Sequence, residues 1–371
     1  MIVEAQRRGI PVMTDLDLVA GRISPNHRTV GITGTNGKTT SVEWLTHILN
    51  QTDEAVALGN IGQSPARFFL QNPSWQGRFI VFELSSFQLH YIRSLYLDIG
   101  VLLNITPDHL SWHGSMELYR KDKLRIIERA TQVSILQEQD RIAFGISAHD
   151  SIQTVSSTHP DVACLIDLSQ KKFRIRLPNQ EAEISFEQIQ LQGFHNLING
   201  AHVALSAFLL GADPATIQNG LNTYTPSEHR MEVFHKHGST LFVNDSKATN
   251  LDATVKAIQT FGNGKKNIIL LAGGCPKGDQ FEALAAEGKD HVRIALLCGE
   301  SVPFISRAME GKIPYETFPR WPMAIKRAIE LIQGDDVILF SPAGSSFDFF
   351  SDYAQRGKQL KKWMLDELSH K

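Results

Sequence analysis

A glycine-rich turn, GITGTNGKTT at positions 31–40, lies between two stretches of regular pattern. Residues 29–33 are predicted to form a strand, and the apolar residues of 39–50 recur at helical spacing. A strand, a glycine-rich turn and a helix in this order are typical of a phosphate loop, because the turn and the helix start direct several backbone N–H groups at one point. The segment therefore predicts an α/β domain with a phosphate site at the turn.

Two side chains after the turn have the chemistry that a nucleoside triphosphate and its metal require. Lys38 would reach the β- and γ-phosphates, and the Thr39 hydroxyl would bind Mg²⁺. Five residues separate Gly31 from Gly37, one more than in the common P-loop, and Gly34 takes an inner position. The alternative is an ordinary strand–helix turn with an incidental Gly-Lys-Thr, but the order of the elements favours a phosphate site.

Length and composition indicate a two-domain intracellular protein. The chain has 371 residues and a formal net charge of −2, which gives no electrostatic reason to expect a nucleic acid or an anionic membrane as partner. Its three cysteines form no CxxC pair, so neither a disulfide framework nor a structural zinc site is expected. No stretch reaches the ~18 apolar residues of a membrane helix, and the N-terminus lacks the apolar core of a secretion signal. We expect a soluble, cytoplasmic monomer.

Strands and helices alternate along most of the chain. Residues 1–21 suggest the end of a domain, with a helix over 4–8 and a short strand over 10–13. Residues 78–84 and 99–104 are continuous apolar runs, as expected of buried parallel strands. The two-residue period over 171–186 predicts a small antiparallel hairpin.

A second alternating series follows Pro226 and predicts a second doubly wound sheet. Its expected elements are strands at 241–245, 267–272, 292–298 and 337–341 and a helix at 321–333. We therefore predict an α/β protein. Residues 22–227 would form a P-loop-type ATPase domain with a parallel sheet and a small antiparallel addition, and residues 228–371 a Rossmann-like domain.

The phosphate loop resembles the GTNGKTT segment of the Mur ligases and their folylpolyglutamate synthetase relatives. Further segments match that family in the same order, at residues 59–62, 82–89, 104–110, 121–126, 195–199, 229–233, 244–250, 273–278 and 341–348. The segment FELSSFQL at 82–89 is similar to the D-glutamate-adding branch. One such match is weak, whereas the ordered set is specific to the family.

The resemblance implies an ATP-dependent ligase of cell-wall precursor synthesis that works through an acyl phosphate. The expected substrates are D-glutamate and UDP-N-acetylmuramoyl-L-alanine, and the expected cofactors are ATP and two Mg²⁺ ions. In the family a UDP-binding domain precedes the phosphate loop, but only 30 residues precede Gly31 here. Residues 1–21 are therefore expected to be a remnant of that domain, and binding of the UDP precursor is expected to be weak.

The resemblance also implies the catalytic and metal-binding residues. Lys38 would act on the phosphates, and the metal ligands would be Thr39, Glu83, His109 and Lys123. A lysine ammonium has no lone pair for a metal, but the matching lysine of the family carries a carbamate formed from CO₂. The alternatives are a surface carboxylate for Glu83, a structural hydrogen-bonding residue for His109 and an exposed helix lysine for Lys123.

The remaining implied site residues bind nucleotide or substrate. The nucleotide set is Gly34, Thr35, Asn36, Gly37, Lys38, Thr39, Thr40, Asn199, Arg230 and Asp245. The substrate set is Asn60, Ser85, Lys247, Thr249, Lys277, Ser346 and Phe347. For each of the lysines in the substrate set, a solvated surface charge is the alternative. For the whole chain, the alternatives are another ligase of the superfamily, similar to folylpolyglutamate synthetase, and a non-catalytic nucleotide-binding protein.

Overall fold

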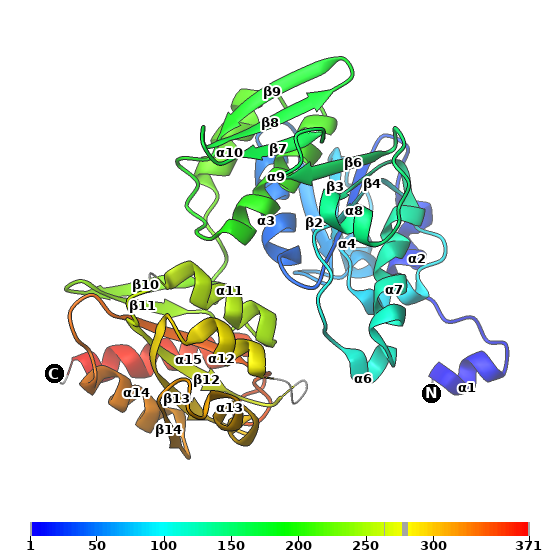
Figure 1. Ribbon diagram of the computed structural model, residues 1–371. Helices are drawn as coiled ribbons and strands as arrows, with labels where there is room; N and C mark the ends of the chain where they lie inside the picture. The colour runs from blue at the N-terminus through cyan, green and yellow to red at the C-terminus, as the bar shows by residue number, and fades with distance from the viewer. Residues whose placement is uncertain (1, 263, 277–280, 370–371) are drawn as a thin grey trace. The chain divides into compact units, whose positions relative to one another are not determined.

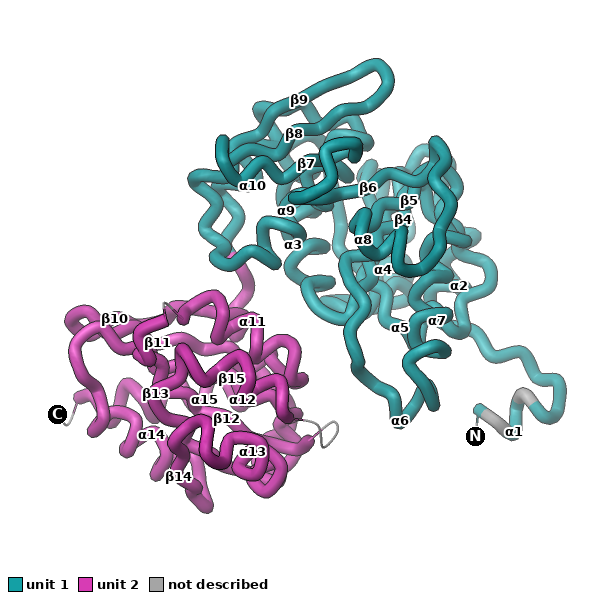
Figure 2. Tube along the Cα trace, viewed as in Figure 1, with its two compact units in different colours: residues 1–225 teal, residues 226–371 magenta. Residues whose placement is uncertain are grey.

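The computed structural model describes residues 2–262, 264–276 and 281–369. The chain divides into two compact units, Met1–Thr225 and Pro226–Lys371, which are teal and magenta in Figure 2. Each unit is a sheet with helices on both faces (Figure 1). Within the described ranges, no helix has the length and apolar character needed to cross a bilayer.

Unit 1 contains a nine-stranded sheet in the order β2-β3-β1-β4-β5-β6-β7-β8-β9. Strands β1 to β7 pair in parallel, and β8 and β9 extend the sheet as an antiparallel hairpin. The strands are β1 Arg28–Thr33, β2 Ala55–Gly59, β3 Phe79–Glu83, β4 Leu97–Leu102, β5 Ala130–Gln137, β6 Ile152–Ser156, β7 Cys164–Asp167, β8 Lys172–Leu177 and β9 Gln180–Ser185. The apolar side chains of β3 are buried along its whole length, because helices cover both faces.

Two separate apolar cores attach the helices of unit 1 to the sheet. One core holds α3, α9 and α10 on one face, with Trp44 and Leu205 among its members. The other holds α2, α4, α5 and α7 on the opposite face, with Leu89 and Ile126. The helices are α1 Ile2–Arg7, α2 Asp15–Val19, the 3-10 helix η1 Ala20–Arg22, α3 Lys38–Leu49, α4 Pro65–Gln71, α5 Ser86–Tyr91, α6 Leu110–His113, α7 Met116–Arg129, α8 Glu138–Ala143, α9 Phe194–Leu209 and α10 Pro214–Thr223.

Unit 2 contains a six-stranded sheet in the order β10-β11-β15-β12-β13-β14, in which β10 is antiparallel and the other pairs are parallel. Its strands are β10 Glu232–His237, β11 Thr240–Asn244, β12 Ile268–Gly273, β13 Val292–Cys298, β14 Tyr315–Phe318 and β15 Val337–Ala343. One face is covered by α11 Leu251–Phe261, α12 Glu282–Gly288 and α13 Val302–Met309, and the other by α14 Trp321–Glu330 and α15 Tyr353–Leu368.

The predicted α/β fold with two mostly parallel sheets and an antiparallel hairpin is confirmed. The strand expected over 10–13 is wrong, because these residues pair with no strand of the described ranges and the Ile10 N–H instead donates to the Ala5 carbonyl at 2.9 Å. Ile10 and Met13 lie in a loop after α1 with side chains 54% and 52% exposed. These apolar residues therefore belong to an exposed connecting segment and do not form a strand.

Trp44 provides a test of how unit 1 packs. Its side chain is fully buried and stacks on Tyr224, with ring centroids 5.5 Å apart. Trp44→Ala should lower the free energy of unfolding by about 3–5 kcal/mol, because truncation leaves a cavity. Urea denaturation followed by circular dichroism measures this loss. Leu70→Ala, at a side chain 81% exposed, is the control and should change stability by less than about 0.5 kcal/mol; similar losses in both variants would contradict the packing.

Candidate active site

Three loops of unit 1 meet at the carboxyl end of its parallel sheet. Strand β1 lies between β3 and β4, so the segments that follow these strands are neighbours. The phosphate loop follows Thr33, Glu83 ends β3, and Asn104 lies just after β4. Ligands of open α/β sheets bind at this edge. Residues that are far apart in the sequence therefore come together at one place.

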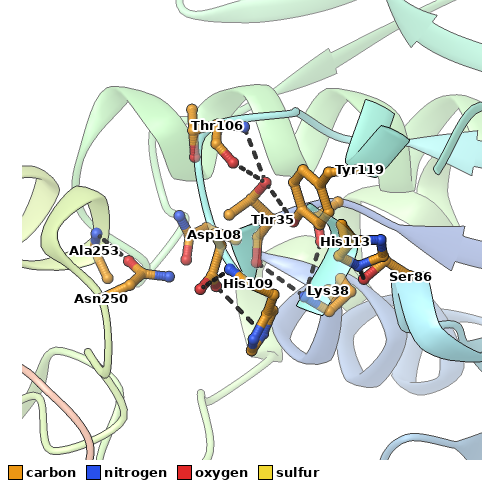
Figure 3. Close-up of polar contacts among 12 residues, drawn as sticks. Thr35, Lys38, Ser86, Thr106, Asp108, His109, His113, Tyr119, Asn250 and Ala253 are labelled. Carbon is orange, nitrogen blue, oxygen red and sulfur yellow. Dashed lines mark hydrogen bonds and ion pairs between the residues drawn. The ribbon is translucent and has the colours of Figure 1, made fainter. Parts of the chain in front are cut away.

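Side chains of the neighbouring segments hold the phosphate loop in shape. The Asn36 N–H donates to Asn104 Oδ1 at 2.9 Å, and Asn104 Nδ2 donates to the Asn36 carbonyl at 3.0 Å. The Thr35 hydroxyl lies 3.0 Å from both the Tyr119 hydroxyl and the Thr106 carbonyl (Figure 3). Helix α3 starts directly after the loop. Its first N–H groups lack helical partners, which makes this position favourable for an anion.

Gly37 is the residue of the loop whose conformation requires glycine. Its φ is 84°, and a Cβ at this position would lie 2.8 Å from the side chain of Asn199. Asn199 is buried on α9, and its Nδ2 donates to Asn196 Oδ1 at 3.3 Å. Thr39 and Thr40 are the second and third residues of α3. The loop therefore has the predicted shape, while the nucleotide contacts of these side chains stay predictions.

Two lysine side chains converge on the carbonyl oxygen of Gly34. Lys38 Nζ donates to it at 2.8 Å and to the Thr35 carbonyl at 2.9 Å. Lys123 Nζ donates to the same oxygen at 2.7 Å and lies 3.4 Å from Thr33 Oγ1. If both amino groups were protonated they would repel each other, and a phosphate beside them would relieve the repulsion. The electrostatics of the site therefore favour an anionic ligand.

Lys123 is 1% exposed, so it is not the solvated helix lysine of the alternative interpretation. Burial, and then the charge of Lys38, hold the pKa of Lys123 well below its ordinary range, although Asp108 and Glu83 oppose the shift. A neutral amine has a lone pair that can add to CO₂, whereas an ammonium has none. The surroundings of Lys123 therefore suit carbamate formation, and the carbamate itself stays a prediction.

Glu83 is 2% exposed, so it is not a surface carboxylate. Asn60 Nδ2 donates to Glu83 Oε1 at 3.0 Å, and Oε2 is buried without a hydrogen-bond partner in the described part of the chain. Buried carboxylate oxygens are normally satisfied, and Mg²⁺ prefers such oxygen ligands. The donor set fits this metal, with the Glu83 carboxylate and the Thr39 hydroxyl as hard ligands at the edge of the phosphate loop.

His109 lies where the loop after β4 turns into α6. Its backbone has a φ of 54°, and its N–H donates to Asp108 Oδ1 at 2.9 Å. Its ring Nε2 is 3.5 Å from Asp108 Oδ2, and its side chain is 36% exposed (Figure 3). Among the residues that the structure describes, no three or more His, Cys, Asp or Glu side chains are arranged to hold a metal ion. The predicted metal ligands include two such residues, Glu83 and His109, and their metal-binding roles stay predictions.

Ser85 was predicted to contact substrate, and its hydroxyl caps helix α5. Ser85 Oγ accepts a hydrogen bond from the Gln88 N–H at 3.2 Å and donates one to Gln88 Oε1 at 2.8 Å. This reciprocal arrangement fixes the start of α5 immediately after Glu83. Ser85 and Asn60 therefore shape the site, and substrate contacts by them stay predictions.

Asp245 of unit 2 is predicted to bind the nucleotide, and its surroundings shift the pKa of its carboxyl. It is 5% exposed and accepts hydrogen bonds from Ser341 Oγ at 2.7 Å and from the Met231 N–H at 3.1 Å. Burial raises the pKa of its carboxyl to about 7, although the charge of Arg230 opposes the shift. Arg230 is partly buried just before β10. Both residues belong to unit 2, and their nucleotide contacts stay predictions.

Four of the predicted amino-acid-binding residues lie at the carboxyl edge of the sheet of unit 2. Those that the structure describes follow β11 or β15, namely Lys247, Thr249, Ser346 and Phe347. Lys247 Nζ lies 3.8 Å from the centre of the Tyr353 ring. Ser346 is buried, whereas Phe347 is 73% exposed. Lys277 lies outside the described residues.

Several side chains contact these sites without having been singled out from the sequence. Asn104, the first residue of the matched segment 104–110, pairs with the phosphate loop although no site role was predicted for it, and the Tyr119 hydroxyl lies 3.0 Å from that of Thr35. Helical spacing was the available signal for Tyr119, because it lies four residues before Lys123 on α7. Arg356 is fully buried and donates to the carbonyls of Ser246 and Gly344, but its surroundings in the sequence do not mark it.

Two family models match the chain. The Mur ligase middle domain matches residues 32–207, and the Mur ligase glutamate ligase domain matches residues 229–344. The chain is 33% identical over 377 residues to the UDP-N-acetylmuramoylalanine–D-glutamate ligase of Caldicellulosiruptor bescii, covering 99% of this chain and 81% of that protein. It is 34% identical over 362 residues to the ligase of the same name from a Geobacillus species, covering 96% and 78%.

Solved structures share the fold. The MurF ligase of Thermotoga maritima in complex with ADP superposes with a TM-score of 0.72 and 18% identity, over 97% of this chain and 85% of that one. A pseudomurein peptide ligase type C from Methanothermus fervidus superposes with a TM-score of 0.70 and 20% identity, over 94% and 80%. At this identity the likeness concerns the fold.

Asp245→Asn tests the ionisation at the site of unit 2. The carboxyl titrates near pH 7 in the folded chain and at about pH 3.9 when unfolded, so the folded state binds more protons between these values. The free energy of unfolding should therefore fall as pH rises from 4 to 7. Asparagine does not titrate, so the variant should not lose this stability. The free energy of unfolding of Asp245→Asn relative to wild type should therefore be about 2 kcal/mol higher at pH 8 than at pH 5.

Urea denaturation at the two pH values measures this difference. Asp335→Asn, at an exposed position of the same unit, is the control and should change stability equally at pH 5 and pH 8. A pH-independent effect of Asp245→Asn would contradict the raised pKa.

Proposed function

The chain belongs to the Mur ligase family, and we propose that it joins D-glutamate to the L-alanyl carboxylate of UDP-N-acetylmuramoyl-L-alanine. As a Mur ligase it is an ATP-dependent amide ligase of peptidoglycan synthesis. The finer assignment draws its support from relatives named for this reaction at about one-third identity over nearly the whole chain. The segment FELSSFQL, which ends β3 and starts α5, supports it too.

The pair of lysines on the Gly34 carbonyl carries the proposal, together with a buried carboxylate oxygen of Glu83 that has no hydrogen-bond partner among the residues that the structure describes. Phosphoryl transfer is mainly a matter of positioning and charge neutralisation. Lys38 would bind phosphate oxygens, and Glu83 would hold a cation that neutralises them. A site with these charges suits ATP better than a neutral ligand.

The reaction follows from the chemistry of amide formation. A carboxylate oxygen of the precursor attacks the γ-phosphorus of ATP, and ADP leaves with the electron pair of the broken P–O bond. The ammonium group of D-glutamate loses one proton to become an amine, which attacks the acyl carbon. Phosphate departs with the electron pair of the broken C–O bond, and the nitrogen releases a second proton to solvent. Mg²⁺, when bound, offsets the negative charge of the phosphates. In this scheme Lys38 would bind the transferred phosphoryl group, and Thr39, Glu83, His109 and Lys123 would hold the Mg²⁺ ions.

Unit 2 supplies the groups proposed to bind D-glutamate and the nucleoside. Lys247, Thr249 and Ser346 lie at the carboxyl edge of its sheet, and a lysine with two hydroxyls matches the carboxylates of an acidic amino acid. Lys277 is proposed for the same role. Arg230 and Asp245 are proposed to contact ATP, at the phosphates and the ribose.

Phosphate release with a panel of amino acids tests the proposed function. With ATP, Mg²⁺ and UDP-N-acetylmuramoyl-L-alanine, the chain should release phosphate with D-glutamate and far more slowly with L-glutamate. Lys38→Ala should lower this rate by at least about a hundredfold, because a charge contact made in the transition state is lost. A preference for L-glutamate, or full activity of Lys38→Ala, would refute the assignment.

Lys123→Ala tests the proposed carbamate. The variant should be nearly inactive, since it loses an anionic metal ligand. Short carboxylic acids such as acetate should partly restore its activity, because they fit the vacated space and supply the missing oxygens. Lys123→Met, which fills that space, is the control and should gain nothing from acetate. A wild-type rate in Lys123→Ala would rule out the carbamate.

A further inference from the structure

A buried chain of hydrogen bonds runs through unit 1 beside the proposed metal ligands. Ser86 Oγ lies 2.9 Å from His113 Nε2, and His113 Nδ1 lies 2.9 Å from Asp122 Oδ2 (Figure 3 shows the first of these). His90 Nδ1 lies 2.9 Å from Asp122 Oδ1 and 3.0 Å from Oδ2, the oxygen that His113 also contacts. A carboxylate only accepts hydrogen bonds, so each histidine presents an Nδ1–H to Asp122, and Nε2 of a neutral His113 accepts from Ser86.

The order serine, histidine, aspartate is that of a hydrolytic triad, but burial argues against a nucleophile here. Ser86 is 3% exposed, and the His113 side chain is fully buried. A cavity of about 630 Å³ reaches His90, His113 and Asp122, and Ser86 is not among the described residues that line it. A substrate carbonyl therefore has no access to the hydroxyl, and the chain of bonds needs another role.

The hydrogen bonds join the three segments that carry Glu83, His109 and Lys123. Ser86 is the first residue of α5, three positions after Glu83. His113 ends α6, and its N–H donates to the His109 carbonyl at 3.1 Å. Asp122 directly precedes Lys123 on α7. The bonds therefore link the end of β3, the loop after β4 and helix α7.

Helix α6 depends on such a link more than the other segments do. It comprises four residues, and a helix this short is not stable by itself. Aromatic rings fix the orientation of His113, with Phe87 stacked at 5.5 Å, Tyr119 at 5.0 Å and Trp112 at 4.5 Å between ring centroids. These contacts hold the His113 ring in the orientation in which Nδ1 reaches Asp122 and Nε2 reaches Ser86.

We propose that His113 is a positioning residue for the metal site. Through Asp122 and Ser86 it fixes Glu83, His109 and Lys123 relative to one another, so that they bind Mg²⁺ together with ATP. This inference rests on the proposed function only in assigning Mg²⁺ to these three residues. Partners that orient metal ligands typically change metal affinity by about 10–100-fold when they are removed. A purely structural histidine would change stability without changing the response to Mg²⁺.

Calorimetric titration of ATP into the full chain, with Mg²⁺ and with a chelator in its place, tests the proposal without any turnover. His113→Phe keeps the aromatic packing and removes both hydrogen bonds. We expect the gain in ATP affinity that Mg²⁺ gives to fall by about tenfold, while the affinity without Mg²⁺ stays within about twofold of wild type. Thermal unfolding of each variant checks that it is folded.

His90→Phe is the matched control, because it removes the other hydrogen bond to the same Asp122 carboxylate. The His90 side chain is 39% exposed, and the bond that it makes to Asp122 does not reach α6. This variant should keep the Mg²⁺ gain within about twofold. Ser86→Ala, which deletes a single hydroxyl, should lower the gain by about threefold and decides the matter if His113→Phe does not fold.

Three results would overturn the proposal: an unchanged Mg²⁺ gain in His113→Phe or in Ser86→Ala, an equal loss in His90→Phe, or no Mg²⁺ gain in the wild-type chain. The test uses neither the UDP precursor nor D-glutamate. Absence of D-glutamate-dependent phosphate release would therefore refute the proposed function while leaving this experiment fully informative.

Discussion

Two lysine amino groups share the carbonyl oxygen of Gly34, and this crowding sets the chemistry of unit 1. Lys38 and Lys123 both donate to that oxygen within 2.8 Å, and Lys123 is almost fully buried. Desolvation and mutual repulsion both disfavour the doubly charged state. The charge is relieved when an anion binds beside Lys38 or when Lys123 becomes neutral or anionic. Binding of ATP would bring an anion beside Lys38, and carbamate formation would make Lys123 anionic. The proposed cofactor and the proposed modification would therefore relieve the same repulsion.

The sheet topology brings the other residues of the site to the phosphate loop. Strand β1 leads into the phosphate loop and has β3 on one side and β4 on the other. Glu83 therefore approaches the loop from one flank, and Asn104 and His109 from the other. The paired hydrogen bonds between Asn36 and Asn104 fix the loop backbone, so the carbonyl of Gly34 stays directed at both lysines. Motifs that are separated in the sequence thus lie at the ends of neighbouring strands.

Much of the fold followed from the sequence because it rests on local pattern. The strand, turn and helix around Gly37 and the hairpin β8–β9 depend on periodicity and on glycine conformation. The expected strand at 10–13 failed because strand formation depends on a partner that local pattern does not reveal. Burial of Lys123 and the bond between His113 and Asp122 depend on packing between α5, α6 and α7. A lysine flanked by charged residues looks exposed until those helices are assembled.

In the proposed reaction the site activates a carboxylate by phosphorylation. Precursor labelled with oxygen-18 in its alanyl carboxylate tests this most directly, because an acyl phosphate leaves one carboxylate oxygen on the phosphate that departs. After turnover with unlabelled ATP and D-glutamate, mass spectrometry of the released phosphate should show the label. Unlabelled phosphate, formed alongside the amide product, would contradict the account.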